Sequence, residues 1–100
     1  MCLIVLAFQV HESVPLLVAA NRDEFHARPT RDADWWPDMP DVLAGRDLQA
    51  GGTWLGVHRS GRFAAVTNYH DDHPPSTTLE SRGRLVTDYL LGALDPMVYL

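Results

Sequence analysis

Apolar residues come in short runs separated by polar segments that contain proline, and this pattern predicts strands. Residues 2–10 form a nearly unbroken apolar run rich in β-branched and aromatic types, which is typical of a strand buried on both faces. Residues 11–15 interrupt the run, and Pro15 cannot occupy the interior of a strand ladder. A second apolar run covers 16–20. The two runs predict an antiparallel hairpin with a five-residue loop at 11–15.

A second hairpin and one helix are predicted further along the chain. Strands are expected at 53–58 and 62–67, joined through the tight-turn dipeptide Ser60-Gly61. A helix is expected to begin near Leu79, because Thr77 and Glu80 have the spacing of a capping box. Apolar residues then follow at helical spacing and would form one apolar face. They are Leu85, Val86, Tyr89, Leu90 and Leu94, and Asp95-Pro96 could start another helix.

Residues 21–50 show no sustained apolar period. The segment is mostly polar and carries Pro29, Pro37 and Pro40. We therefore expect a long loop, and a loop of this length in a small domain indicates a functional or binding segment. Trp35-Trp36 would anchor it to something apolar.

Composition limits the class of protein. With 46% hydrophobic residues, 21% charged residues and a net charge of -5, the chain has the profile of a soluble globular domain without a basic surface for nucleic acid. A single cysteine excludes an internal disulfide. The apolar start lacks a positively charged leader, and no stretch reaches the roughly 20 apolar residues that span a bilayer. We expect a cytoplasmic protein with no membrane span.

Cys2 directly follows the initiator methionine, and this position allows a specific chemistry. Methionine is normally removed when the next side chain is small, which leaves a thiol and a free α-amine on one residue. The amine can act as a base near neutral pH, so such a nucleophile needs no histidine. By itself, however, a cysteine in an apolar strand is more often a core residue.

The predicted hairpin brings a polar segment to the end where Cys2 lies. If residues 10 and 16 flank the loop, residue 2 lies opposite residue 24, give or take two. The second strand changes there from apolar to the polar sequence Asn-Arg-Asp-Glu at 21–24. A carboxylate could hold the α-ammonium group, and an arginine could favour the thiolate, the form that attacks. The alternative is a solvated strand end with an Arg–Asp ion pair.

The second hairpin predicts a similar cluster. With its turn at 60–61, Asn68 faces Thr53, and Gly51-Gly52 come directly before Thr53. Two glycines permit close backbone approach and can aim N–H groups at an anion. Asn68 could add a side-chain donor, and together these groups would form an oxyanion hole. Ordinary turn chemistry and a strand-end asparagine are the alternative.

Several short motifs follow one another along almost the whole chain. They are Met1-Cys2, AANRDEF at 19–25, Arg28-Pro29, GGTWLG at 51–56, TNY at 67–69 and SRGRLV at 81–86. In this order they resemble the transport and Golgi organisation protein 2 family, also called the NRDE family. The resemblance implies an αββα N-terminal-nucleophile hydrolase fold, similar to penicillin V acylase and bile salt hydrolase.

The resemblance also implies roles for individual residues. In those relatives the N-terminal cysteine attacks an amide carbonyl. Their aspartate and arginine are separated in sequence, whereas the matching pair is adjacent here. The candidate catalytic residues are Cys2, Arg22, Asp23 and Asn68, the last as oxyanion donor. The candidate substrate-binding residues are Asn21, Gly52, Thr53 and Trp54.

The predicted fold class is α+β, with antiparallel strands and one helix. One helix covers one face of a four-stranded sheet, while the first hairpin looks apolar on both faces and needs further cover. The chain would therefore either form a homo-oligomer or be the N-terminal part of a longer αββα domain. Family members are much longer, and we expect 1–100 to be one incomplete domain.

Two functions from different classes remain open. The first is an enzyme that hydrolyses a linear amide with Cys2, without cofactor or metal. The second is a non-catalytic binding or trafficking protein, since the family resemblance includes members implicated in haem handling and secretory organisation. Possible axial ligands for haem are His11, His26, His58, His70 and His73. A zinc site at His70-Asp71-Asp72-His73 is disfavoured, because the sequence offers no further ligands nearby.

Overall fold

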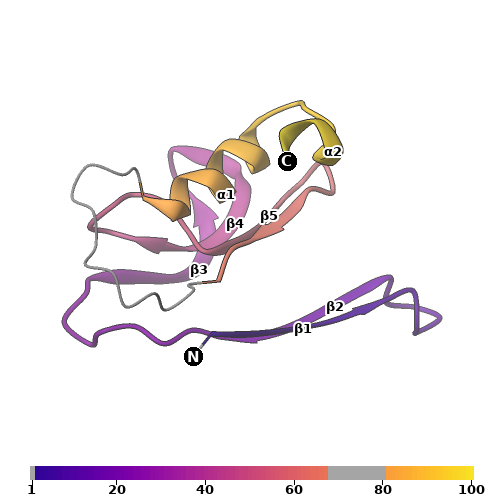
Figure 1. The fold of residues 1–100 in the computed structure, drawn as a ribbon, viewed down its shortest axis with the longest axis horizontal. Coiled ribbons are helices and arrows are strands. Elements are labelled where there is room, and N and C mark those ends of the chain that lie inside the picture. Colours follow the sequence, from indigo (N-terminus) through magenta and orange to yellow (C-terminus); the bar gives the residue numbers. More distant parts are fainter. Residues whose placement is uncertain (1, 68–80) are drawn as a thin grey trace.

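The computed structural model describes residues 2–67 and 81–100 and has an α+β architecture with two antiparallel sheets (Figure 1). The smaller sheet pairs β1 (Leu3–Phe8) with β2 (Leu16–Asn21), and the larger has the order β3-β4-β5-β6. The larger sheet contains β3 (Thr30–Trp36), β4 (Met39–Asp47), β5 (Leu55–His58) and β6 (Phe63–Ala65). The predicted α+β class is confirmed, but the single sheet made of two hairpins is wrong.

The first predicted hairpin is confirmed, but β1 ends at Phe8, so its loop covers residues 9–15 and the predicted five-residue loop at 11–15 is wrong. Its register runs from Leu3 opposite Asn21 to Phe8 opposite Leu16. The Gln9 N–H closes the loop by donating to the Pro15 carbonyl over 2.8 Å. Apolar side chains remain exposed on both faces of this two-stranded sheet. They include Leu3, Val5, Leu6, Phe8 and Leu17.

The long loop predicted at 21–50 is wrong, because β3 and β4 form a hairpin there. The first six residues of β3 are exposed, so no alternation of buried and exposed positions marks this edge strand. The turn falls at Pro37-Asp38, and a register shift between Trp35 and Trp36 accommodates Pro40 on the opposite strand. Trp36 does anchor the segment in the core, where its indole N–H donates to the Ala44 carbonyl over 3.1 Å. Trp35 instead stays half-exposed.

The second predicted hairpin, β5–β6, is also confirmed, although both strands are shorter than predicted. Leu55 lies opposite Ala65 and Val57 opposite Phe63. At the turn, Gly61 has a φ of +93°, a conformation that favours glycine.

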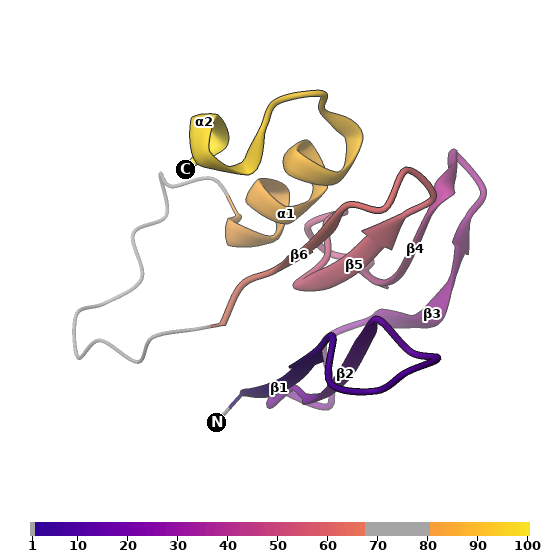
Figure 2. The ribbon, with the colours of Figure 1, turned by 90° about the vertical axis from the view of Figure 1, so that its right-hand side faces the viewer.

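One face of the larger sheet is covered by α1 (Arg82–Leu91), whereas the β1–β2 hairpin lies on the other side (Figure 2). Val86 and Leu90 are buried against the sheet. They form the core with Trp36, Val42 and Ala44. Gly56 allows this approach, since a Cβ there would lie 3.0 Å from Leu90 Cδ1.

The bounds of α1 differ from the prediction. The helix begins at Arg82 with Ser81 as its N-cap, so the predicted start near Leu79 is wrong. The proposed capping box at Thr77 and Glu80 lies outside the described residues. Gly92 is extended and ends the helix, which leaves Leu94 beyond it and exposed. The second predicted helix is confirmed as α2 (Pro96–Tyr99), where the Asp95 side chain accepts from the Met97 N–H.

Candidate functional site

The β1–β2 register decides what lies beside Cys2. The last described pair is Leu3 with Asn21, so one further step along both strands places Cys2 opposite Arg22. Cys2 is a partly buried free thiol. Asn21 and Asp23, on either side of Arg22, are exposed. The hairpin therefore brings the candidate nucleophile and the candidate arginine to the same end of one sheet.

Arg22 has a carboxylate partner that the sequence reasoning did not assign. Its Nη2 lies 2.7 Å from Glu24 Oε2, and both side chains are about four-fifths buried. The other oxygen of Glu24 accepts the Phe25 N–H over 2.9 Å. Residues two apart in an extended chain share a face, which is the signal that could have predicted this pair. Glu24 thus compensates the positive charge that we expected Arg22 to offer to the thiolate.

A second ion pair joins this segment to the larger sheet. Arg28 Nη2 lies 2.5 Å from Asp47 Oδ2 at the end of β4, and Arg28 Nε is 4.0 Å from Glu24 Oε2. The other Asp47 oxygen accepts the N–H groups of Gln49 and Ala50. A chain of alternating charges, from Arg22 through Glu24 and Arg28 to Asp47, thereby links the hairpin end to β4.

The Asp47 carboxylate is held ionised by these contacts. Burial has the largest single effect and by itself would raise the pKa of Asp47. The hydrogen bonds from Arg28, Gln49 and Ala50, together with the positive charge of Arg28, outweigh burial and hold the pKa below its ordinary value. Sequence reasoning missed Asp47, because the pair spans 19 positions and depends on the unpredicted strand β4.

Of the two glycines, only Gly52 is in close contact with another part of the backbone, and that part is a helix. A Cβ on Gly52 would lie 2.8 Å from the carbonyl carbon and oxygen of Gly83, in the first turn of α1. Gly51 has a φ of +82°, and its N–H donates to the Asp47 carbonyl over 2.7 Å. The Thr53 hydroxyl is buried and donates to the Leu55 carbonyl over 3.0 Å. Gly51 N–H is therefore engaged within the fold.

Some of the candidate residues line one polar cavity of about 250 Å³. Arg22, Thr53 and Trp54 are among its walls, whereas Cys2 and Gly52 are not. The other walls are Glu24, Thr30, Arg31, Gly45, Arg46 and Asp47. Guanidinium and carboxylate groups side by side can hydrogen-bond a small polar ligand. The candidate oxyanion donor Asn68 lies outside the described residues.

The described histidines lie away from this cavity. The rings of His11 and His58 each contact a serine two residues on, Ser13 and Ser60, through Nδ1. His26 is exposed, and none of the three lines the polar cavity. His70 and His73 lie outside the described residues. Within 2–67 and 81–100, no group of three or more histidine, cysteine or acidic side chains could hold a metal ion.

No helix in the described part of the chain is long and apolar enough to cross a membrane.

Comparison with known proteins agrees with the order of the motifs. The family model described as Transport and Golgi organisation 2 matches residues 1–100. The Transport and Golgi organization protein 2 homolog of Homo sapiens is 39% identical over 109 residues, which cover all of this chain and 38% of the relative. The homolog of Bos taurus is also 39% identical, over 107 residues. Transport and Golgi organization protein 2 of Drosophila melanogaster is 39% identical over 84 residues, or 78% of this chain and 29% of the relative. The chain thus spans well under half the length of these relatives.

Proposed function

Because this chain belongs to the Transport and Golgi organisation 2 family, we propose that it acts through Cys2, as an N-terminal-cysteine hydrolase of a linear amide. The observation that carries this proposal is the register of β1 and β2, which brings Cys2 opposite Arg22. Arg22 in turn lines the polar cavity with Thr53 and Trp54. A nucleophile at the strand end, next to a residue that lines a polar cavity, supports this proposal.

In the proposed reaction, removal of Met1 gives Cys2 a free α-amine. The amine takes the thiol proton as the sulfur attacks the amide carbonyl carbon, and the proton passes to the leaving nitrogen when the C–N bond breaks. Water then hydrolyses the thioester and restores the thiol. Asp23 orients the amine. Because the Gly51 N–H is hydrogen-bonded to the Asp47 carbonyl, the oxyanion would be stabilised instead by the Asn68 side chain and by backbone N–H groups other than that of Gly51.

The test begins with the N-terminus and the thiol. Intact mass should show that Met1 is absent. Since Cys2 is the only cysteine of the chain, a thioester trapped after incubation with an N-acyl 4-nitroanilide reports this residue alone. Cys2→Ser and Asp23→Asn should abolish most release of 4-nitroaniline, whereas His58→Ala, on the β5–β6 turn, should leave it unchanged. Retention of Met1, or full turnover by Cys2→Ser, would refute the enzyme proposal.

A second candidate function is non-catalytic binding or trafficking on the same scaffold. It is favoured by the names of the relatives, which refer to transport and Golgi organisation. It also agrees with the pairing of Arg22 with Glu24 and of Arg28 with Asp47, which suits a binding cavity without a reactive group. A binding protein can keep Met1 and does not need the thiol. Haem binding, followed by its absorption spectrum, that persists in Cys2→Ser, Asp23→Asn and Asn68→Ala proteins without amidase activity would favour this candidate.

A further inference from the structure

The two edges of the larger sheet differ in how they are protected. At one edge, β3 exposes Arg31, Asp32 and Asp34, and charged residues at an exposed edge discourage pairing with another strand. At the other edge, β6 has the sequence Phe-Ala-Ala and no charged residue. Arg62, directly before β6, does not guard this edge, because its guanidinium donates to the carbonyls of Tyr89 and Leu94. The β6 edge therefore has the composition of a strand that is paired on both sides.

The backbone of β6 can be divided by the direction of its hydrogen bonds. On the β5 side, the Val66 N–H donates to the Trp54 carbonyl and the Arg62 carbonyl accepts from His58. In an antiparallel pair these groups alternate with outward-facing ones, so Phe63 and Ala65 direct their N–H and carbonyl groups away from β5. Among the described residues, no strand pairs with this outer edge. The edge thus offers a ready ladder for one more strand.

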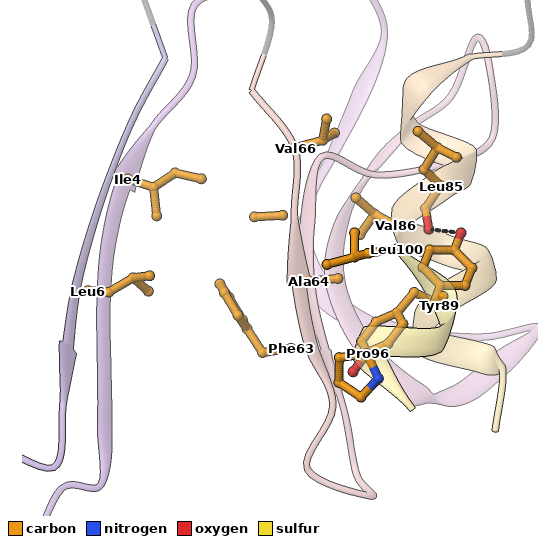
Figure 3. A pocket seen from close by; sticks show the side chains of 12 residues that line it. Ile4, Leu6, Phe63, Ala64, Val66, Leu85, Val86, Tyr89, Pro96 and Leu100 are labelled. Atoms are coloured by element: carbon orange, nitrogen blue, oxygen red, sulfur yellow. Dashed lines mark hydrogen bonds between the residues drawn. The ribbon is translucent and has the colours of Figure 1, made fainter. Parts of the chain in front are cut away.

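An apolar cavity of about 770 Å³ surrounds the same edge. In Figure 3, Phe63 points toward Ile4 and Leu6 of the β1–β2 hairpin, whereas Val66 and Ala64 lie on the side of α1. Leu85, Tyr89 and the terminal residue Leu100 form the opposite wall. Leu6 is 55% exposed and Leu100 is 97% exposed, which leaves apolar surface uncovered on both walls. A strand placed beside β6 would direct alternate side chains to the two walls.

We propose that the free edge of β6 is a docking site for an extended apolar polypeptide strand, supplied from outside the region of the relatives that this chain matches. The match covers all of this chain but only 38% of the human relative, so that relative has more than half of its length with which to supply such a strand. The added strand pairs with the outer edge of β6 and fills the cavity between the β1–β2 hairpin and α1. Its backbone hydrogen bonds to β6 provide affinity, and the apolar walls of the cavity fix the register of the strand.

The test joins this chain to the part of the human relative that lies outside the matched region. The two polypeptides are co-expressed, and amide exchange is measured residue by residue in the complex and in the chain alone. The outward amides of Phe63 and Ala65 should exchange at least about tenfold more slowly in the complex. The amides of Ala64 and Val66, which face β5, are the internal control and should be slow in both. If the two polypeptides do not assemble, the same measurement is made on a fusion of the two.

Substitutions separate edge pairing from general contact. Ala65→Pro removes one outward N–H and should prevent assembly while β5–β6 pairing persists. Leu6→Asp should weaken assembly, whereas Val5→Asp, equally exposed at 55% on the other face of β1, should not. Unprotected Phe63 and Ala65 amides in the fusion would overturn the proposal. Slow exchange of these amides in the chain alone would also overturn it. Protection that does not depend on protein concentration would mean that the chain itself covers the edge. Protection that increases with concentration would mean that a second copy covers it.

Discussion

Replacing Gly52 by alanine tests whether the close contact between the segment before β5 and α1 holds the helix in place. The added Cβ would lie 2.8 Å from the carbonyl carbon and oxygen of Gly83 and 3.2 Å from the Arg84 nitrogen. All three are backbone atoms, so no side chain can turn aside and the helix itself must move. Overpacking of this kind costs about 1–3 kcal/mol. The lower entropy of the unfolded alanine chain offsets about 0.4–1 kcal/mol of this. We expect a net loss of about 1–2 kcal/mol.

The measurement is denaturant unfolding followed by circular dichroism, with Gly51→Ala and Gly51→Asn as controls. At Gly51 nothing lies within 4 Å of an added Cβ, and only the φ of +82° opposes substitution. Asparagine tolerates that conformation and should recover part of the loss caused by alanine at position 51. At position 52 serine should be no better than alanine, because any Cβ meets the same backbone. A Gly52→Ala protein as stable as the wild type would refute the packing argument.

Three further predictions concern charge and chemistry. Because the pKa of Asp47 is lowered in the folded protein, its carboxylate stabilises the fold above the unfolded pKa near 4. This stabilisation is lost as the pH falls through the lower folded pKa. In Asp47→Asn the unfolding midpoint should therefore fall less steeply between about pH 5 and 2. Arg62→Ala should speed amide exchange in the last turn of α1, because Arg62 donates to the Tyr89 carbonyl. The control Arg59→Ala removes an exposed ion pair and should change the free energy of unfolding by less than about 1 kcal/mol. Equal exchange in the two variants would contradict the anchoring role of Arg62. If Cys2 is a nucleophile, Asn68→Ala should raise the barrier of the chemical step by about 2.7–4 kcal/mol in single-turnover kinetics, and an unchanged rate would remove Asn68 from the mechanism.

The strands that could be predicted from sequence are those made mostly of apolar residues. Both β1–β2 and β5–β6 were found from apolar runs with a turn signal between them. β3 was missed because an edge strand exposed on both faces has no period-2 pattern, and only Trp36 at its end is buried. The missed signal was the turn at Pro37-Asp38, with Trp35-Trp36 before it and the apolar run 42–44 after it.

The site divides in the same way between local and distant contacts. The approach of Cys2 to the polar segment could be predicted from hairpin geometry, because loop length sets register. The longer loop moves the partner of Cys2 from the predicted central position, residue 24, to Arg22. The Arg28–Asp47 ion pair could not be predicted, since it joins a segment without secondary structure to a strand that was itself missed. The contact of Gly52 with Gly83 shows a related limit, because glycines in sequence indicate close approach but do not identify the partner.

Pairing between strands that are consecutive in sequence has a consequence for how the chain folds during synthesis. Each strand of the β3-β4-β5-β6 sheet can pair as soon as its successor leaves the ribosome, and a hairpin forms in about 1–10 μs. The hydrophobic face of this sheet, however, is covered only when Leu90 of α1 emerges. At about 5–20 residues per second, Trp36 precedes Leu90 by roughly 3–10 s. For that interval the apolar face of the nascent sheet is exposed to solvent. We expect this stage of synthesis to be the one at which chaperones bind and at which core substitutions reduce yield.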